Sequence, residues 1–216
     1  MKKKLVFFLL ICVVSVTLLS ACASAELTEE EVATYTDDVG LSYTLYKVTS
    51  HGEESYYVKV TAYTGKERLN LNDDTFSGVV TVPSKVTIEG AEYPVTVIGS
   101  LVFNQKMLTR IVVEEGITTL EPFSFSYCGC SRIVLPSTIT SIGDYAFVNC
   151  NSLKRLEISA VTPPQVGSYA FMFFNKDKNV YEVNSILIVK VPTVGGDKTV
   201  VNAYKEAWKE YEGIIE

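Results

Sequence analysis

The sequence LPSTITSIGDYAFVNCNSL, residues 135–153, decides the fold of this chain, because its pattern recurs on both sides of it. Within it an aliphatic residue, Ile142, is followed five positions later by a phenylalanine, Phe147. The same pair of residue types recurs at Ile98 and Phe103, at Leu120 and Phe125, and at Val166 and Phe171. The phenylalanines are spaced by 22, 22 and 24 residues, and a repeat of this length indicates a chain that winds into stacked coils.

A short run of β-forming residues follows the phenylalanine in three of these repeats. The runs lie at 111–113, 133–135 and 156–158, with similar runs at 80–82 and 189–191. Pro83, Pro136 and Pro192 end three of the five, which suits proline because it lacks the N–H that a strand ladder needs. We therefore expect each coil to contribute one short strand, and successive strands to pair in parallel about 4.8 Å apart.

The repeated apolar positions are expected to form one continuous core. A single coil cannot bury its own apolar face, so several must stack and both ends must be capped. Cys128 and Cys150 fall in one interior column, and Cys130 falls in a neighbouring one. A disulfide between Cys128 and Cys150 is conceivable, but cysteines in apolar columns are more often free thiols that pack as small hydrophobic residues.

Residues 135–153 resemble one repeat of the BspA-like leucine-rich-repeat family, and the resemblance extends over about residues 78–192. The coil at 111–132 departs from the family pattern, with Glu121-Pro122 where Gly-Asp is usual. The resemblance implies a mainly β repeat solenoid, a right-handed coil with short parallel strands. Known members of the family are bacterial surface proteins, many of them lipid-anchored or secreted, and some bind host matrix proteins or other bacteria.

The N-terminus has the pattern of a secretory signal. Lysines at positions 2–4 precede an almost wholly apolar run at 5–19, which is too short to span a membrane. The run ends in LSAC, residues 19–22, which resembles the bacterial lipobox. We expect a lipoprotein signal peptide at 1–21 and an acyl anchor on Cys22, hence a location on the bacterial cell surface or outer membrane. The alternative is an ordinary cleavage site that contains a cysteine.

The rest of the chain is expected to divide into a tether, two caps and the solenoid. Residues 22–40 are acidic and predict a solvated tether. Residues 41–78 predict an N-terminal β cap, with hairpin strands at 41–48 and 56–63, followed by the solenoid at 79–192. A second hairpin is expected at 86–97 and a rim loop at 175–179. Val200, Tyr204, Ala207, Trp208 and Tyr211 fall at helical spacing, so 193–216 predicts a C-terminal capping helix whose tryptophan closes the core.

No residue set has the spacing of a catalytic or metal site. His51, the only histidine, lies in a polar turn, and Glu114-Glu115 at a strand end is more typical of a solvated rim than of an acid–base pair. We therefore expect no enzyme, no metal and no cofactor. The net charge of −6, which becomes more negative when the signal lysines are removed, argues against a nucleic-acid partner.

An arginine precedes the first inward position of three successive strands. Alternation along a strand turns these arginines outward, together with the residues two positions later, and stacking separates them by about 5 Å. One hypothesis is a binding strip for carboxylates or sulfates, which arginine grips in a bidentate manner. The alternative is that the arginines are solvated or paired with Glu157 and Glu114. The candidate binding residues are Arg110, Arg132, Arg155, Val112, Val134 and Glu157.

A second column of large side chains stands two residues before each phenylalanine of the core. It comprises Leu101, Phe123, Tyr145 and Tyr169. One reading is an exposed aromatic stripe of the kind that binds sugars. The other is that these side chains are half-buried against neighbouring coils, with only the polar tips in water.

Together these features predict a monomeric, non-enzymatic surface lipoprotein that binds a protein partner through its repeat face. The alternative is a glycan-binding accessory protein that works in polysaccharide capture. The sheet of a solenoid is extended and rigid, which suits a protein or an acidic glycan better than a small molecule.

Overall fold

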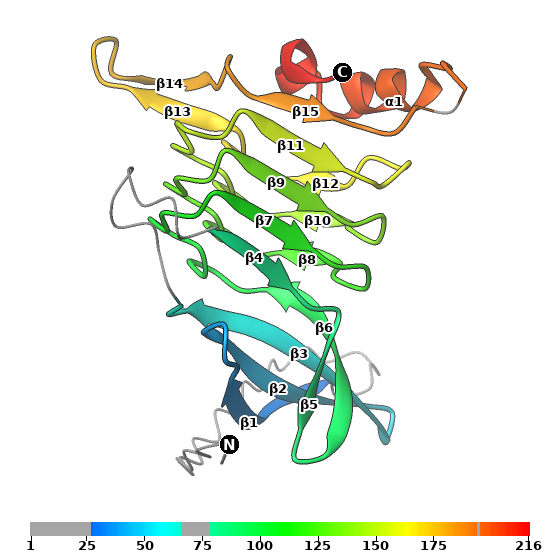
Figure 1. Cartoon of the computed structure of the whole chain (residues 1–216). Helices are drawn as coiled ribbons and strands as arrows, with labels where there is room; N and C mark the ends of the chain where they lie inside the picture. Colours follow the sequence, from blue (N-terminus) through cyan, green and yellow to red (C-terminus); the bar gives the residue numbers. More distant parts are fainter. Residues whose placement is uncertain (1–26, 66–77, 194) are drawn as a thin grey trace, which may run out of the picture.

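The computed structural model describes residues 27–65, 78–193 and 195–216, and the predicted signal peptide and Cys22 lie outside them. The described chain is mostly strand, with one α-helix, α1 (Thr199–Ala207), and one 3-10 helix, η1 (Lys209–Ile214), at its C-terminal end. Figure 1 shows the coils stacked between an N-terminal β cap and this helical end. No helix within the described ranges is long and apolar enough to cross a membrane.

One side of the coil stack is a five-stranded parallel sheet. Its order is β15-β11-β9-β7-β4. The strands are β4 (Val79–Val82), β7 (Arg110–Val113), β9 (Arg132–Leu135), β11 (Arg155–Ile158) and β15 (Ile188–Lys190). In β7 and β9 residues alternate between half-buried and buried, because every second side chain enters the core. The predicted stack of parallel strands is confirmed.

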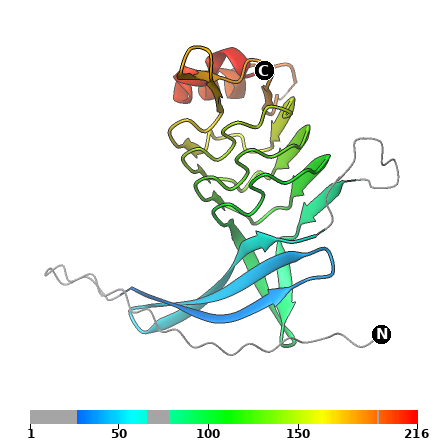
Figure 2. The same ribbon diagram turned by 90° about the vertical axis from the view of Figure 1, so that its left-hand side faces the viewer.

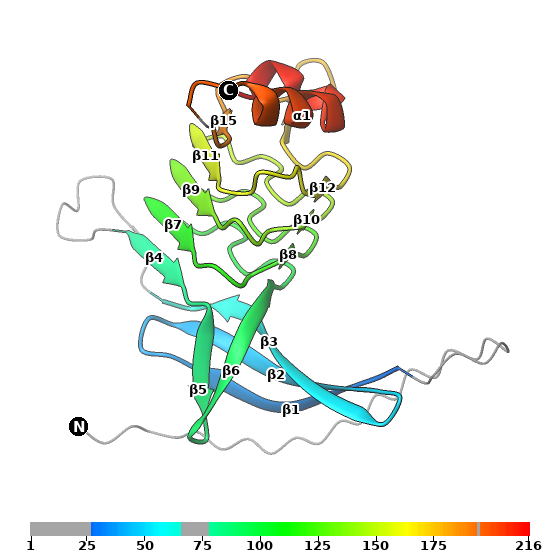
Figure 3. The same cartoon turned by 90° about the vertical axis from the view of Figure 1, so that its right-hand side faces the viewer.

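Four coils also contribute a second strand, which the sequence does not predict. These strands pair in parallel on the opposite side of the stack, as Figure 3 shows. They are β6 (Ala91–Ile98), β8 (Thr119–Leu120), β10 (Ser141–Ile142) and β12 (Gln165–Val166). The expectation of one strand per coil is therefore wrong. Three of these four strands have only two residues, too few to display an alternating pattern.

The four repeated phenylalanines stack in one line through the core, as predicted. Ring centroids are 5.0 Å apart for Phe103 and Phe125, and 5.1 Å for Phe125 and Phe147. The distance from Phe147 to Phe171 is 5.5 Å. All four side chains are buried, and stacked aromatic rings add attraction to the area they bury. The stack gives every coil the same interior.

An antiparallel sheet caps the N-terminal end. It contains β1 (Thr28–Thr36), β2 (Leu41–Ser50) and β3 (Glu53–Tyr63), and β3 continues into the solenoid by pairing in parallel with β6. Figure 2 shows this sheet beneath the coils. The hairpin of β5 (Lys85–Ile88) with β6 is also present as predicted. Tyr63 lies 5.7 Å from Phe103 and covers the first ring of the stack.

The prediction of an acidic tether at 22–40 is wrong over residues 28–36, which form β1. Two of the acidic side chains are bound by tyrosine hydroxyls of β2 and β3. Tyr46 donates to Glu31 at 2.9 Å, and Tyr57 donates to Glu29. The acidic side chains make β1 a charged edge strand, and such a strand does not readily pair with another chain.

The helical end closes the other side of the core. Trp208 lies 5.4 Å from Phe171, and its Nε1 donates to the Pro164 carbonyl at 2.9 Å. The α-helix is shorter than expected, since it ends at Ala207 and the chain continues as η1. The expected loop at 175–179 is the turn of a hairpin between β13 (Met172–Asn175) and β14 (Val180–Val183).

Candidate functional site

The outer face of the five-stranded sheet carries the arginine column. Arg110 pairs in register with Arg132, and Arg132 pairs with Arg155. The inward neighbours Ile111 and Ile133 are fully buried, which turns the arginines to the outside. The structure thus brings the three predicted arginines side by side on adjacent strands.

A second column runs beside the arginines, two residues further along each strand. Its central members are Val112, Val134 and Glu157, in register with one another. The face, turned toward the viewer in Figure 1, is completed by residues that the sequence analysis left out. Val79 and Ile188 extend the arginine column, and Thr81 and Lys190 extend the second column. Ile188 precedes the inward Val189 as each arginine precedes its own inward residue, so the sequence held a signal for it.

One carboxylate on this face binds two arginines. Glu157 lies 2.7 Å from Arg132 of the preceding coil and 3.7 Å from Arg155 of its own strand. Partial burial works to raise the pKa of Glu157, but the hydrogen bond from Arg132 and the nearby positive charges outweigh it and hold the pKa below its usual value. The expected pairing with Glu157 therefore occurs for Arg132 and Arg155.

Arg110 is different from the other two arginines. Among the described residues no carboxylate lies within ion-pair distance of it. The Nε atoms of Arg110 and Arg132 are buried and have no hydrogen-bond partner in the described part of the chain. Glu114, named as a potential partner, instead accepts from the Ser84 backbone N–H at 2.9 Å. The guanidinium group of Arg110, at one end of the arginine column, therefore has hydrogen-bond donors that no carboxylate of the described chain uses.

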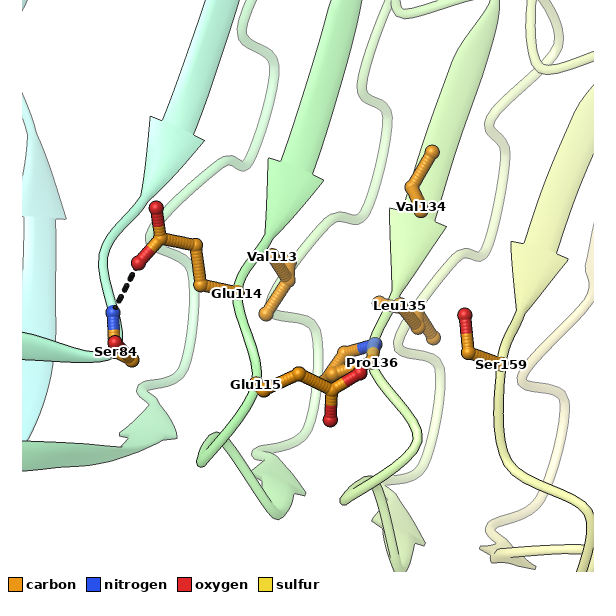
Figure 4. A pocket seen from close by; sticks show the side chains of 8 residues that line it. All are labelled: Ser84, Val113, Glu114, Glu115, Val134, Leu135, Pro136 and Ser159. Carbon is orange, nitrogen blue, oxygen red and sulfur yellow. Dashed lines mark hydrogen bonds between the residues drawn. The ribbon is translucent and has the colours of Figure 1, made fainter.

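A shallow pocket of about 410 Å³ lies where the strands of this sheet end, and Figure 4 shows its side chains. Its acidic residues hold neighbouring coils together. Glu115 accepts from the Ser137 backbone N–H at 2.9 Å and from the Ser137 hydroxyl at 2.8 Å, and this backbone bond holds the Glu115 pKa below its usual value. The lining residues are Ser84, Val113, Glu114, Glu115, Val134, Leu135, Pro136 and Ser159.

The aromatic column is partly exposed, but its rings cover one another. Phe123 and Tyr145 lie 4.9 Å apart with an interplanar angle of 1°, and Tyr145 and Tyr169 lie 5.1 Å apart at 5°. Phe123 and Tyr169 are each 39% exposed, and Leu101 is 57% exposed. The stack therefore shows ring edges to the solvent, whereas a sugar stacks on ring faces. The rings pack against those of neighbouring coils, as the second interpretation predicts, although Leu101 is more exposed than that interpretation expects.

The cysteines are paired differently from the pairing considered above. Cys128 forms a disulfide with Cys130, across a sequence separation of two, and Cys150 is a buried free thiol. The conceivable Cys128–Cys150 bridge is wrong, and so is the expectation that these two cysteines are both free. The Cys150 thiol donates to the Phe125 carbonyl, and burial raises its pKa to about 12.

His51 lies in the exposed turn between β2 and β3, where Nδ1 is 3.1 Å from the Ser50 hydroxyl. No group of three or more His, Cys, Asp or Glu side chains in the described ranges is arranged to hold a metal ion. The outer face of the five-stranded sheet, by contrast, combines charge, exposure and regular geometry, and it is the candidate site.

Comparison with known families identifies the class of protein. The model of the BspA-type leucine-rich-repeat region matches residues 71–190 in six copies. The chain belongs to this family of repeat proteins. The resemblance drawn from residues 135–153 is thus confirmed, as is the repeat solenoid.

Several solved structures share limited similarity with the chain. A leucine-rich cell surface protein from Faecalibacterium prausnitzii A2-165 is 16% identical, with a TM-score of 0.35, and the match covers 77% of this chain and 58% of that one. A leucine-rich-repeat protein from Bacteroides capillosus ATCC 29799 is 19% identical (TM-score 0.34; 74% and 99% covered). The pneumococcal vaccine antigen PcpA is 16% identical (TM-score 0.37; 77% and 51% covered). A comparison with curated proteins finds no match.

Proposed function

We propose that this chain is a lipid-anchored bacterial cell-surface protein that binds a protein partner, without catalysis, through the outer face of its five-stranded sheet. The observation that carries the proposal is the in-register arginine column, of which Arg110 has no carboxylate partner in the described chain. On β7 and β9 an arginine lies beside a valine on this face, and interfaces commonly combine arginine anchors with apolar contact.

Family membership supports a repeat protein that works by binding rather than by chemistry. Two of the structures with limited similarity are described as a leucine-rich cell surface protein and a vaccine antigen, which agrees with a surface location. The lipobox-like sequence at 19–22 supports anchoring through Cys22. Because β1 begins at Thr28, six residues of about 3.5 Å each hold the N-terminal cap within about 20 Å of such an anchor.

The glycan-binding alternative is less well supported by the geometry. The rings stack face to face, which covers both faces of Tyr145 and one face each of Phe123 and Tyr169, so little ring face is left to receive a sugar. The sheet face carries charge and aliphatic groups instead of the aromatic platform that a neutral polysaccharide uses. A protein partner fits this combination better.

The binding proposal is tested with immobilised extracellular-matrix proteins and a glycan array, probed with the full chain. We expect retention on a protein, and its loss in the triple variant Arg110→Glu, Arg132→Glu, Arg155→Glu. A matched triple variant, Lys85→Glu, Lys178→Glu, Lys209→Glu, changes the net charge equally on other surfaces and should still bind. Equal binding by both variants, or retention only on neutral glycans, would contradict the proposal.

The anchor is tested separately by incorporation of radiolabelled palmitate in a bacterial host. Wild-type chain should take up the label and the Cys22→Ala variant should not. Label that persists in the variant would show that the acyl chain is attached elsewhere or that the lipobox assignment is wrong.

A further inference from the structure

One carboxylate of the solenoid itself is bound to the arginine column. Glu157 places a carboxylate between Arg132 of the preceding coil and Arg155 of its own strand. Because the coils repeat, the same position exists once more on this face, one coil earlier. There Val134 is the register partner of Glu157, and Arg110 and Arg132 replace Arg132 and Arg155.

This earlier position has the cations but lacks the carboxylate. A valine side chain leaves the space above it open and supplies an aliphatic floor, while Val112 extends this floor toward the edge of the sheet. Both residues are half-buried, as is Arg110. Within the described chain Arg110 makes no ion pair, and the buried Nε atoms of Arg110 and Arg132 have no hydrogen-bond partner. An external carboxylate therefore meets the terminal guanidinium nitrogens, and Arg110 is the less saturated of the two arginines.

From this equivalence we infer that the sheet face holds a specific site for one carboxylate, bound between Arg110 and Arg132 above Val134, and that an acidic side chain of a protein partner fills it. The inference rests on the proposed function, since it names the chemistry by which that face recognises a protein.

An acidic peptide fits this site better than a sulfated polysaccharide. Glu157 already occupies the space between Arg132 and Arg155, so the position between Arg110 and Arg132 is the one of this kind that is open to an external anion on the described face. A polysulfated chain gains affinity by contacting several cations at once, and the Glu157 carboxylate within the arginine column repels its sulfates. A glutamate flanked by aliphatic residues matches both the arginine pair and the valine floor.

The site also has a polarity along the strand direction. Beyond Val134 the pocket of Figure 4 is lined by Pro136 and by the carboxylates of Glu114 and Glu115, which are already hydrogen-bonded within the protein. These carboxylates repel a second acid. The partner residue that lies toward the strand ends is therefore expected to be neutral, so the favoured segment has one acid among apolar residues.

The test is an NMR titration of the full chain in which the Nε–Hε resonances of the arginines are followed. The probe is the peptide acetyl-Val-Glu-Val-amide, compared with its glutamine counterpart. We expect saturable shifts at Arg110 and Arg132, and affinity about fivefold or more weaker for the glutamine peptide, because hydrogen bonds to a charged group are stronger. Absence of shifts at both arginines would overturn the inference.

Variants of the site sharpen the test. Val134→Glu should supply the missing carboxylate from within the chain and abolish peptide binding, whereas the uncharged Val134→Gln should keep it. Arg110→Gln should weaken binding about tenfold, since a charge-assisted contact is lost. Lys178→Gln is the control that should leave affinity within about twofold, because Lys178 lies in the turn of the β13–β14 hairpin, outside the sheet face. Binding that survives both Val134→Glu and Arg110→Gln would contradict the site.

A third arm uses a sulfated heparin disaccharide as the probe. If it bound more tightly than the glutamate peptide and depended on Arg155 as well as Arg110, a sulfated glycan would replace the acidic peptide and the inference would fail. The site and the proposed function can fail separately. Binding of a matrix protein that is lost in the arginine triple variant but unchanged by Arg110→Gln and Val134→Glu would leave the proposed function standing and remove only this site.

Discussion

The Glu157 carboxylate lies 2.7 Å from the Arg132 guanidinium and joins two neighbouring strands of the five-stranded sheet. Replacing it by Glu157→Gln should lower the free energy of unfolding by less than about 1 kcal/mol, because both side chains are partly exposed and water screens the pair. The same change should free Arg132 and Arg155 for an external anion. Peptide titration should then show shifts at Arg155 that wild-type chain lacks. The control is Glu182→Gln, which removes a carboxylate on the β13–β14 hairpin.

Phe125 occupies the middle of the buried ring stack, with neighbours on both sides. Phe125→Ala should lower the free energy of unfolding by about 3–5 kcal/mol, since it removes the transfer energy of the ring and leaves a cavity. Urea denaturation followed by circular dichroism measures the change. Phe174→Ala, at a residue 37% exposed, is the matched control and should cost much less. Similar losses for the two variants would mean that the stack is not the core.

The three described cysteines should differ sharply in chemical behaviour. Peptide mapping of the unreduced chain should recover Cys128 linked to Cys130. Cys150 should resist iodoacetamide at about pH 8 and react once the chain is unfolded, because burial both hides the thiol and raises its pKa to about 12. Rapid alkylation of Cys150 in the native chain would contradict its position in the core.

Tyr127 has a left-handed backbone conformation, with φ of 56°, that costs a non-glycine residue energy. The equivalent residue of the next coil is Asn149, also at φ of 56°, and asparagine tolerates this conformation better. Tyr127 is 53% exposed, so its ring contributes little to the core. Tyr127→Asn should therefore raise the free energy of unfolding by about 0.5–1 kcal/mol. A lower melting temperature of the variant would contradict this prediction. It would show that the exposed ring makes a contact whose stabilisation exceeds the cost of the left-handed backbone conformation.

The sequence allowed the stacked core and the arginine column to be predicted because both depend on the repeat period. Phe125 and Phe147 stand 22 residues apart, and each coil places its phenylalanine in the same environment. Once the strand positions are known, alternation alone decides that Arg132 faces outward. Properties that repeat with the coil can therefore be read from the sequence.

Features that depend on local geometry were missed. The two-residue strand Ser141–Ile142 is defined by its neighbours in adjacent coils and not by a pattern of its own. The Cys128–Cys130 bridge depends on a turn that brings the two Cα atoms to 5.5 Å. The acidic residues of β1 favour a solvated tether when the sequence is considered alone. Their hydrogen bonds from Tyr46 on β2 and Tyr57 on β3 depend on how the sheet assembles and have no sequence pattern.

The inferred binding site depends on Val134 being the structural equivalent of Glu157 one coil earlier. The most direct measurement is a crystal structure of the Val134→Glu variant. We expect the new carboxylate to lie within hydrogen-bond distance of both Arg110 and Arg132, with the strand register unchanged. A carboxylate turned into solvent, with Arg110 unmoved and unbound, would contradict the account.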